Sequence, residues 1–71
     1  MNKLVVTTKS GSVYIVDTEK NTISGGHFGQ AIVPCKIDGY IMIGASMRGV
    51  AFFNHEWGML TTSTVEKITR A

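Results

Sequence analysis

The chain of 71 residues is long enough for one domain, and it carries a formal net charge of +2 and one cysteine. Because hydrophobic residues make up 44% of the sequence and charged residues 17%, the composition excludes an intrinsically disordered chain. The lone Cys35 excludes an intramolecular disulfide, so the stability of so small a core must come from packing or from association with other chains. We expect one folded domain over residues 1–71.

The sequence shows neither a membrane span nor an export signal. Its apolar runs are far shorter than the roughly 18 residues of a spanning helix, and the apolar stretch after Lys3 is too short for a signal peptide. A reduced cysteine suits the cytoplasm, so we expect a cytoplasmic protein with no membrane partner. Lysines and arginines are scattered along the chain, which argues against nucleic acid as a partner.

Residue types indicate an all-β fold before any window is examined. Val, Ile and Thr account for 22 residues, against two Leu and four Ala. Side chains branched at Cβ lose rotamer freedom in helices and pack well on pleated surfaces. We therefore expect strands throughout.

The first half of the chain predicts a hairpin followed by a loop and a further strand. A glycine between two β-rich runs supplies the positive φ of a tight turn, so residues 3–9 and 12–17 should pair across Ser10-Gly11. Residues 22–24 continue as a short strand, and residues 25–29 form a glycine-rich loop. Residues 30–37 form the next strand, in which Pro34 requires an edge or a bulge because proline has no amide hydrogen.

The second half of the chain predicts four more short strands separated by turns. Asp38-Gly39 is a second hairpin signal. The expected strands are residues 40–45, 50–53, 59–62 and 65–69, with turns at residues 46–49 and 54–58. Short strands at this spacing predict a small antiparallel β-barrel or rolled sheet.

Several of these strands are apolar on both faces, which predicts association. A sheet with one solvated face alternates apolar and polar residues, whereas residues 40–43 are apolar without interruption. A barrel of this size has no second layer of its own, so another copy of the chain is the simplest cover. We predict a homo-oligomer built on residues 40–45 and 50–53; the alternative is a monomer that exposes scattered apolar residues.

The segment from Ser24 to Gln30 is the most distinctive candidate for ligand binding. Gly25 and Gly26 can turn backbone amides outward into an anion-binding nest, and His27 and Phe28 follow directly. The segment lacks the lysine and the helix of a P-loop. A connection between β units, without a ligand, is the alternative interpretation.

Two further residues are candidates for contacting a ligand. Trp57 falls in a predicted polar turn, where it can stack on a base or anchor a partner; otherwise it folds back to cap the barrel. Arg48 falls in a predicted turn between two apolar strands, where its planar donor fork suits phosphate at a subunit junction. An ordinary solvated arginine is the alternative.

No arrangement of residues predicts catalysis, a metal or a cofactor. His55-Glu56 lacks the second histidine of a zinc motif, and no Cys-x-x-Cys pair exists. Cys35 directly after proline in a strand is typical of an inert small hydrophobe. The five carboxylates form no acid and base pair, so we expect a binding protein and not an enzyme.

The two ends of the chain resemble a group of short phage-encoded proteins. The resemblance covers residues 3–17 and 60–68, the latter ending in the pattern Thr62-Ser63-x-Val65-x-x-Ile68. Those proteins are small β-barrels of the Src-homology-3 type, and the resemblance implies a phage accessory protein in the cytoplasm of an infected bacterium. Similar compact, oligomeric phage proteins sequester nucleotide second messengers of host defence.

These observations lead to one functional hypothesis and two alternatives. The hypothesis is an oligomeric, non-enzymatic barrel that sequesters a small anionic ligand such as a nucleotide second messenger. Arg48, Trp57, His27 and the loop of Gly25, Gly26 and Phe28 would contact it. The alternatives are a small barrel that binds single-stranded nucleic acid and an inhibitor that docks on a host protein.

Overall fold

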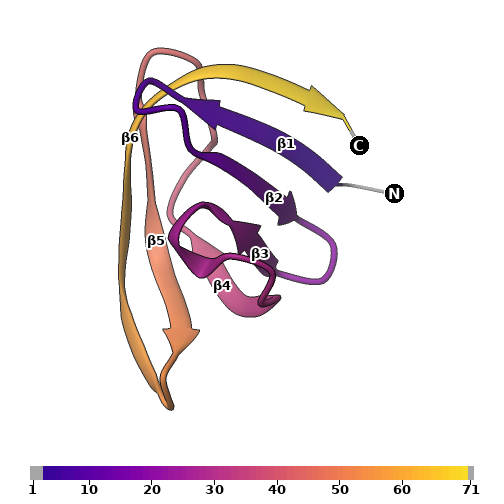
Figure 1. Ribbon diagram of the computed structural model, residues 1–71, viewed down its shortest axis with the longest axis vertical. Helices are drawn as coiled ribbons and strands as arrows, with labels where there is room; N and C mark the ends of the chain where they lie inside the picture. The colour runs from indigo at the N-terminus through magenta and orange to yellow at the C-terminus, as the bar shows by residue number, and fades with distance from the viewer. Residues whose placement is uncertain (1–2, 71) are drawn as a thin grey trace.

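A computed structural model describes residues 3–70, which form a closed antiparallel barrel of six strands. Each strand pairs with the next in the chain, and β6 returns to pair with β1 (Figure 1). The all-β prediction and the antiparallel barrel are confirmed. The elements are β1 (Lys3–Thr8), β2 (Val13–Asp17), β3 (Thr22–Gly25), the 3-10 helix η1 (Gly26–Phe28), β4 (Val33–Ile37), β5 (Ser46–Phe53) and β6 (Glu56–Arg70).

The predicted N-terminal hairpin is confirmed as β1 and β2, but its turn is longer than the predicted Ser10-Gly11: β1 ends at Thr8, whose amide donates to the carbonyl of Ser12 at 2.9 Å. The register places Lys3 opposite Asp17 and Thr7 opposite Val13. Gly11 has a φ of 90° in the turn, and its amide donates to the carbonyl of Thr8 at 2.9 Å. The run of β-branched residues and the turn glycine therefore specify this hairpin locally.

The strand at residues 22–24 is also confirmed, and the glycine-rich segment packs tightly after it. Gly25 and Gly26 have φ angles of 87° and 52°. A Cβ on Gly26 would overlap the ring of Tyr14, and a Cβ on Gly25 would overlap the carbonyl oxygen of Val13. Glycine is needed here so that η1 can lie against β2.

Pro34 lies where β4 passes from one neighbour to the other. Val33 and Pro34 pair with β3, and from Cys35 onward β4 pairs with β5. Because proline cannot donate to a strand ladder, it is tolerated at this change of partner. The observed strand begins at Val33, three residues later than predicted.

The predicted strand at residues 40–45 is wrong. This segment is an irregular loop between β4 and β5, and Gly39 and Gly44 both have positive φ, at 75° and 93°. The loop is tied to β6, because the amide of Gly44 donates to the carbonyl of Val65 and the amide of Val65 donates to Ala45. The Asp38-Gly39 hairpin is wrong for the same reason.

The predicted turns at residues 46–49 and 54–58 are wrong as well. Residues 46–49 belong to β5, and the true turn between β5 and β6 has two residues, Asn54 and His55, both with positive φ. The predicted strands 59–62 and 65–69 are parts of the single strand β6. A register shift near Ser46 allows this long strand to bend, and the Thr62 hydroxyl there accepts the amide of Met47 at 3.0 Å.

The barrel core consists of side chains from every strand together with Phe28 of η1. The buried hydrophobic residues are Val6, Tyr14, Val16, Ile23, Phe28, Val33, Cys35, Met47, Ala51, Leu60 and Val65. Phe28 lies against Phe53, with ring centroids 5.4 Å apart. This core fixes the positions of β4, β5 and β6, on whose outer surface the candidate site lies.

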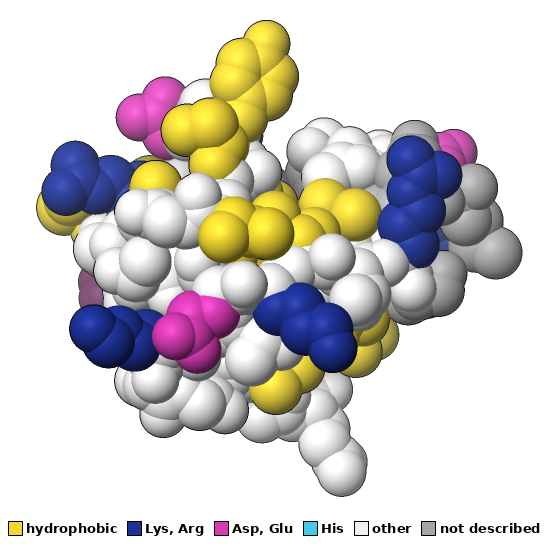
Figure 2. All heavy atoms as spheres, turned by 90° about the horizontal axis from the view of Figure 1, so that it is seen from above, with side chains coloured by type: hydrophobic (Ala, Val, Ile, Leu, Met, Phe, Trp, Pro, Cys, Tyr) yellow, Lys and Arg dark blue, Asp and Glu magenta, His cyan; other side chains and the backbone are white. Residues whose placement is uncertain are grey.

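The apolar loop of residues 38–45 is not covered by the rest of the barrel. Tyr40 is 90% exposed, and Met42 and Ile43 are also exposed, whereas Ile41 packs against the core. Seen from the end of the molecule where this loop lies, hydrophobic side chains gather beside lysine and arginine side chains (Figure 2).

Candidate ligand-binding face

The outer surface of β4, β5 and β6 carries alternate side chains of each strand. In β5, Met47 and Ala51 point into the core, so Arg48, Val50 and Phe52 point outward. The register pairs these three with Thr61, Met59 and Trp57 of β6. Three cross-strand rows therefore lie side by side on one face.

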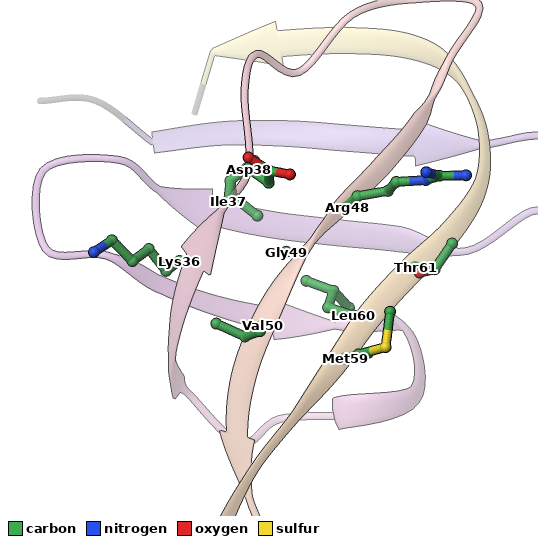
Figure 3. A pocket seen from close by; sticks show the side chains of 9 residues that line it. All are labelled: Lys36, Ile37, Asp38, Arg48, Gly49, Val50, Met59, Leu60 and Thr61. Atoms are coloured by element: carbon green, nitrogen blue, oxygen red, sulfur yellow. The ribbon is translucent and has the colours of Figure 1, made fainter.

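A groove with a cavity volume of about 610 Å³ lies on this face and has cations on either side. Its lining residues are Lys36, Ile37, Asp38, Arg48, Gly49, Val50, Met59, Leu60 and Thr61. Lys36 and Arg48 extend toward opposite sides of the groove, with Val50 between them (Figure 3). The side chain of Leu60 is buried and borders the groove from the core side. We call this feature the cationic groove.

The sheet register explains why the two cations share the groove. Lys36 of β4 pairs with Val50 of β5, so Lys36 lies one strand and two residues from Arg48. Asp38 contributes one carboxylate to the rim. The two cations offer charge to an anionic ligand, and the apolar side chains between them offer contact area to a partly planar one.

An exposed aromatic pair continues the same face beyond the cationic groove. Phe52 and Trp57 are cross-strand partners with ring centroids 5.4 Å apart in an edge-to-face arrangement. Trp57 is 56% exposed. An exposed ring can stack on a nucleobase or on another aromatic group.

The structure brings Arg48 and Trp57 onto one face but corrects their local setting. Both were predicted in turns, and both lie in strands, in β5 and β6 respectively. Because they stand in strands, their directions are fixed by the pleat and not by a flexible turn.

The other predicted site residues lie elsewhere. His27 and Phe28 line a second, smaller cavity of about 220 Å³ together with Phe53, Glu56 and other residues of the β5–β6 hairpin. The Nδ1 of His27 lies 3.3 Å from the hydroxyl of Tyr14. This cavity shares Met59 with the cationic groove, but the groove contains none of the residues of the glycine-rich loop.

Two amides of the glycine-rich loop are used within the loop. The Gly25 amide donates to the carbonyl of Gly29 at 2.8 Å, and the Gly29 amide donates to that of Gly26 at 3.2 Å. An anion nest needs such amides free to point at a ligand. Packing against Tyr14 is the role that the structure gives to Gly25 and Gly26, and their contact with a ligand stays a prediction.

Four further residues of this face were not predicted from the sequence: Lys36, Val50, Phe52 and Met59. Alternating outward residues at positions 48, 50 and 52 and at 57, 59 and 61 were the available signal. That signal becomes visible once the hairpin turn is placed at Asn54-His55.

Cys35 lies in the barrel core. Cys35 is buried, and burial raises the pKa of its thiol, which keeps it protonated. Within residues 3–70, no three metal-binding side chains lie close enough together to hold an ion. No helix in this part of the chain is long and apolar enough to cross a membrane.

Comparison with known proteins gives no match to a family model, to a curated protein or to a solved structure.

Proposed function

We propose that the chain is a non-enzymatic binding protein for a nucleotide-type anion, held on the outer face of β4, β5 and β6. The observation that supports this proposal is the cationic groove, whose Lys36 and Arg48 lie on the same face as the exposed Phe52 and Trp57. The two cations would bind phosphate, and the aromatic pair would stack on the base.

Arginine and lysine would contribute differently to phosphate binding. The guanidinium of Arg48 offers a planar fork of donors that matches two phosphate oxygens, whereas the ammonium of Lys36 acts as a point charge. The apolar floor of Val50 and Met59 would cover the sugar. In this proposal the ligand is bound and released unchanged.

The resemblance of the chain ends to short phage-encoded proteins extends this proposal to a biological role. In the cytoplasm of an infected bacterium, such a protein would sequester a nucleotide second messenger and so counter host defence. Sequestration favours a homo-oligomer, because an open groove covers little of a small ligand unless a second copy covers the rest. The small barrel of the Src-homology-3 type is part of the same proposal.

Single-stranded nucleic acid is a second candidate ligand, favoured by one observation. The cationic groove is open and continues into the aromatic pair, so a chain of several nucleotides can lie across both. This candidate predicts affinity that increases with oligonucleotide length and falls as salt rises.

Calorimetric titration with signalling mononucleotides, cyclic dinucleotides and a short oligonucleotide tests the proposal. Arg48→Gln should weaken binding about tenfold, because a charged hydrogen bond contributes about 1.5 kcal/mol. Lys36→Gln should weaken it by a smaller factor. The matched controls are Arg70→Gln and Lys67→Gln, exposed residues of β6 away from the groove, which should bind as the unmodified chain does. Absence of binding across the panel, or equal losses in the controls, would contradict the proposal.

A further inference from the structure

The first half of β6 has an unpaired edge. Residues 56–61 pair with β5 on one side, whereas the pairing of β6 with β1 begins at Val65. In Figure 1 this part of β6 is the outermost strand, and within the described residues 3–70 no strand lies beyond it. Unpaired edges are templates for adding another strand.

The two-residue turn determines which backbone groups face this edge. Residues that flank a two-residue hairpin turn form a hydrogen-bonded pair, here Phe53 and Glu56, and such pairs then alternate along the ladder. The amides and carbonyls of Trp57, Met59 and Thr61 therefore point away from β5. Each copy offers three donors and three acceptors along this edge.

The edge lacks the features that usually prevent strand addition. Natural edges carry lysine, proline or a bulge, but residues 57–61 contain none of them. Trp57 is 56% exposed and Met59 is 90% exposed. Two of the three side chains beside the free backbone groups are thus apolar and uncovered.

We propose that a second copy of this chain pairs with this edge, β6 against β6, about a two-fold axis at Met59. An edge strand can always meet its own copy antiparallel about a two-fold axis. The register centred on Met59 satisfies all three outward-facing residues of both copies, since Trp57 then lies opposite Thr61 of the partner subunit. Glu56 lies opposite Thr62 of the partner subunit, so no like charges meet.

This pairing would also complete the ligand site. That second step rests on the proposed function, whereas the proposal of the dimer is independent of it. One row of the joined sheet runs from Phe52 through Trp57 to Thr61 and Arg48 of the partner subunit. Neighbouring strands lie about 4.8 Å apart, which places the Cα atoms of Trp57 and that arginine roughly 10 Å apart. In the single chain, the side chain of Arg48 already extends toward β6 on the side of Thr61 (Figure 3).

The mass in native solution, measured without ligand by light scattering or sedimentation, tests the dimer. The unmodified chain should have twice its 7.7 kDa mass. Met59→Pro removes an amide that β5 does not use, and Met59→Lys places two charges on the axis, so both should give monomers. Met42→Lys makes the same change in the exposed loop of residues 38–45 and should leave the dimer intact. Circular dichroism would show that each variant is folded.

Three results of this measurement would overturn the dimer. The first is an unmodified chain that is monomeric. This result includes the case in which its β6 edge pairs with an extended segment of another protein and not with a second copy. The second is a dimer that Met59→Lys leaves intact. The third is a dimer that Met42→Lys disrupts, because it would place the interface on the loop.

A cross-link measures the register directly. Hydrogen-bonded antiparallel partners have Cα atoms about 5.5 Å apart, which suits a disulfide. In a Cys35→Ala background, Met59→Cys should form a linked dimer under mild oxidation, and Met42→Cys should not. Linkage at position 42, or none at position 59, would overturn the register.

Mixing two variants tests whether the site is shared between copies. Arg48→Gln and Trp57→Ala should each bind ligand weakly alone, but their mixed dimer contains one site with both residues intact. Mixing should therefore restore about one quarter of the sites. No restoration would show that the site lies within one chain, and a dimer that binds no nucleotide would contradict the proposed function while leaving the dimer in place.

Discussion

Gly49 and Gly58 lie in neighbouring strands, but a methyl group would meet very different surroundings at the two positions. At Gly49 it would overlap the carbonyl oxygen of Lys36 and lie 2.9 Å from the Cα of Ile37, whereas at Gly58 nothing lies within 4 Å. Gly49 therefore sets how closely β4 approaches β5 beneath the cationic groove.

Gly49→Ala should destabilise the fold by about 1–3 kcal/mol, because β4 must shift away. Gly58→Ala is the matched control and should change the free energy of unfolding by less than about 0.5 kcal/mol. Urea denaturation of both variants measures the difference. Equal effects of the two substitutions would show that the close approach of β4 and β5 is not required.

Asp17 should make the stability depend on pH in the acid range. Its carboxylate accepts the backbone amides of Lys20 and Glu19, each at 3.0 Å, and these bonds hold its pKa below the usual value of 3.8. A lowered pKa stabilises the folded state above the unfolded value, and this contribution is lost as the pH falls through the folded value. Stability should therefore fall as the pH drops below about 4.

Asp17→Asn should flatten this part of the pH profile, because the amide oxygen can accept hydrogen bonds but does not titrate. Urea denaturation at a series of acid pH values measures the effect, with Glu66→Gln as the exposed control. A profile for Asp17→Asn as steep as that of the unmodified chain would assign the acid sensitivity to other groups.

At the scale of elements, the turn of the β5–β6 hairpin stores strain that a substitution can release. Asn54 and His55 have φ angles of 54° and 67°, the conformation of a type I′ turn. Asparagine tolerates this region and glycine adopts it freely, but other residues have a cost of about 1–2 kcal/mol.

His55→Gly should raise the free energy of unfolding by about 1 kcal/mol, because Asn-Gly is the preferred sequence for this turn. His55→Ala removes the imidazole but keeps the strain, so it separates the backbone effect from the loss of the side chain. A gain in His55→Ala equal to that in His55→Gly would attribute the effect to the imidazole. Chemical denaturation measures both.

The elements also show which parts of the fold could be predicted from sequence. The β1–β2 hairpin was predicted because β-branched runs flank a turn glycine, and both signals are local. The middle was not predicted, because residues 40–43 are a continuous apolar run and yet do not form a strand. They lie in a loop between Gly39 and Gly44, which both have positive φ. The Asn54-His55 turn was placed too broadly, since histidine at positive φ is uncommon.

Those errors changed the local setting of Arg48 and Trp57, which lie in strands on one face and not in turns. The side chains of Arg48 and Trp57 suit phosphate and base, a property that does not depend on the secondary structure around them. Lys36 was missed because its place beside Arg48 depends on the pairing of β4 with β5, and nothing in the local sequence specifies that register. The contacts of Phe28 with Tyr14 and Phe53 likewise depend on the closed barrel.

At the scale of the whole molecule, Cys35 should report on global unfolding. It is 3% exposed in the core, and burial raises the pKa of its thiol, so the folded protein should react very slowly with a thiol reagent. The reaction rate should rise with urea in parallel with the fraction unfolded. A fast reaction in native buffer would show that β4 opens locally.

The proposed function depends on the outer face of β4, β5 and β6. The most direct test of this binding face is a ligand titration of the isotope-labelled protein, monitored by nuclear magnetic resonance. The same mononucleotide, cyclic dinucleotide and oligonucleotide panel should shift the amide signals of Lys36, of Arg48 to Phe52 and of Trp57 to Thr61, together with the indole signal of Trp57. Shifts confined to Gly25, Gly26, His27 and Phe28, or no shift with any ligand, would contradict the assignment of the binding site to this face.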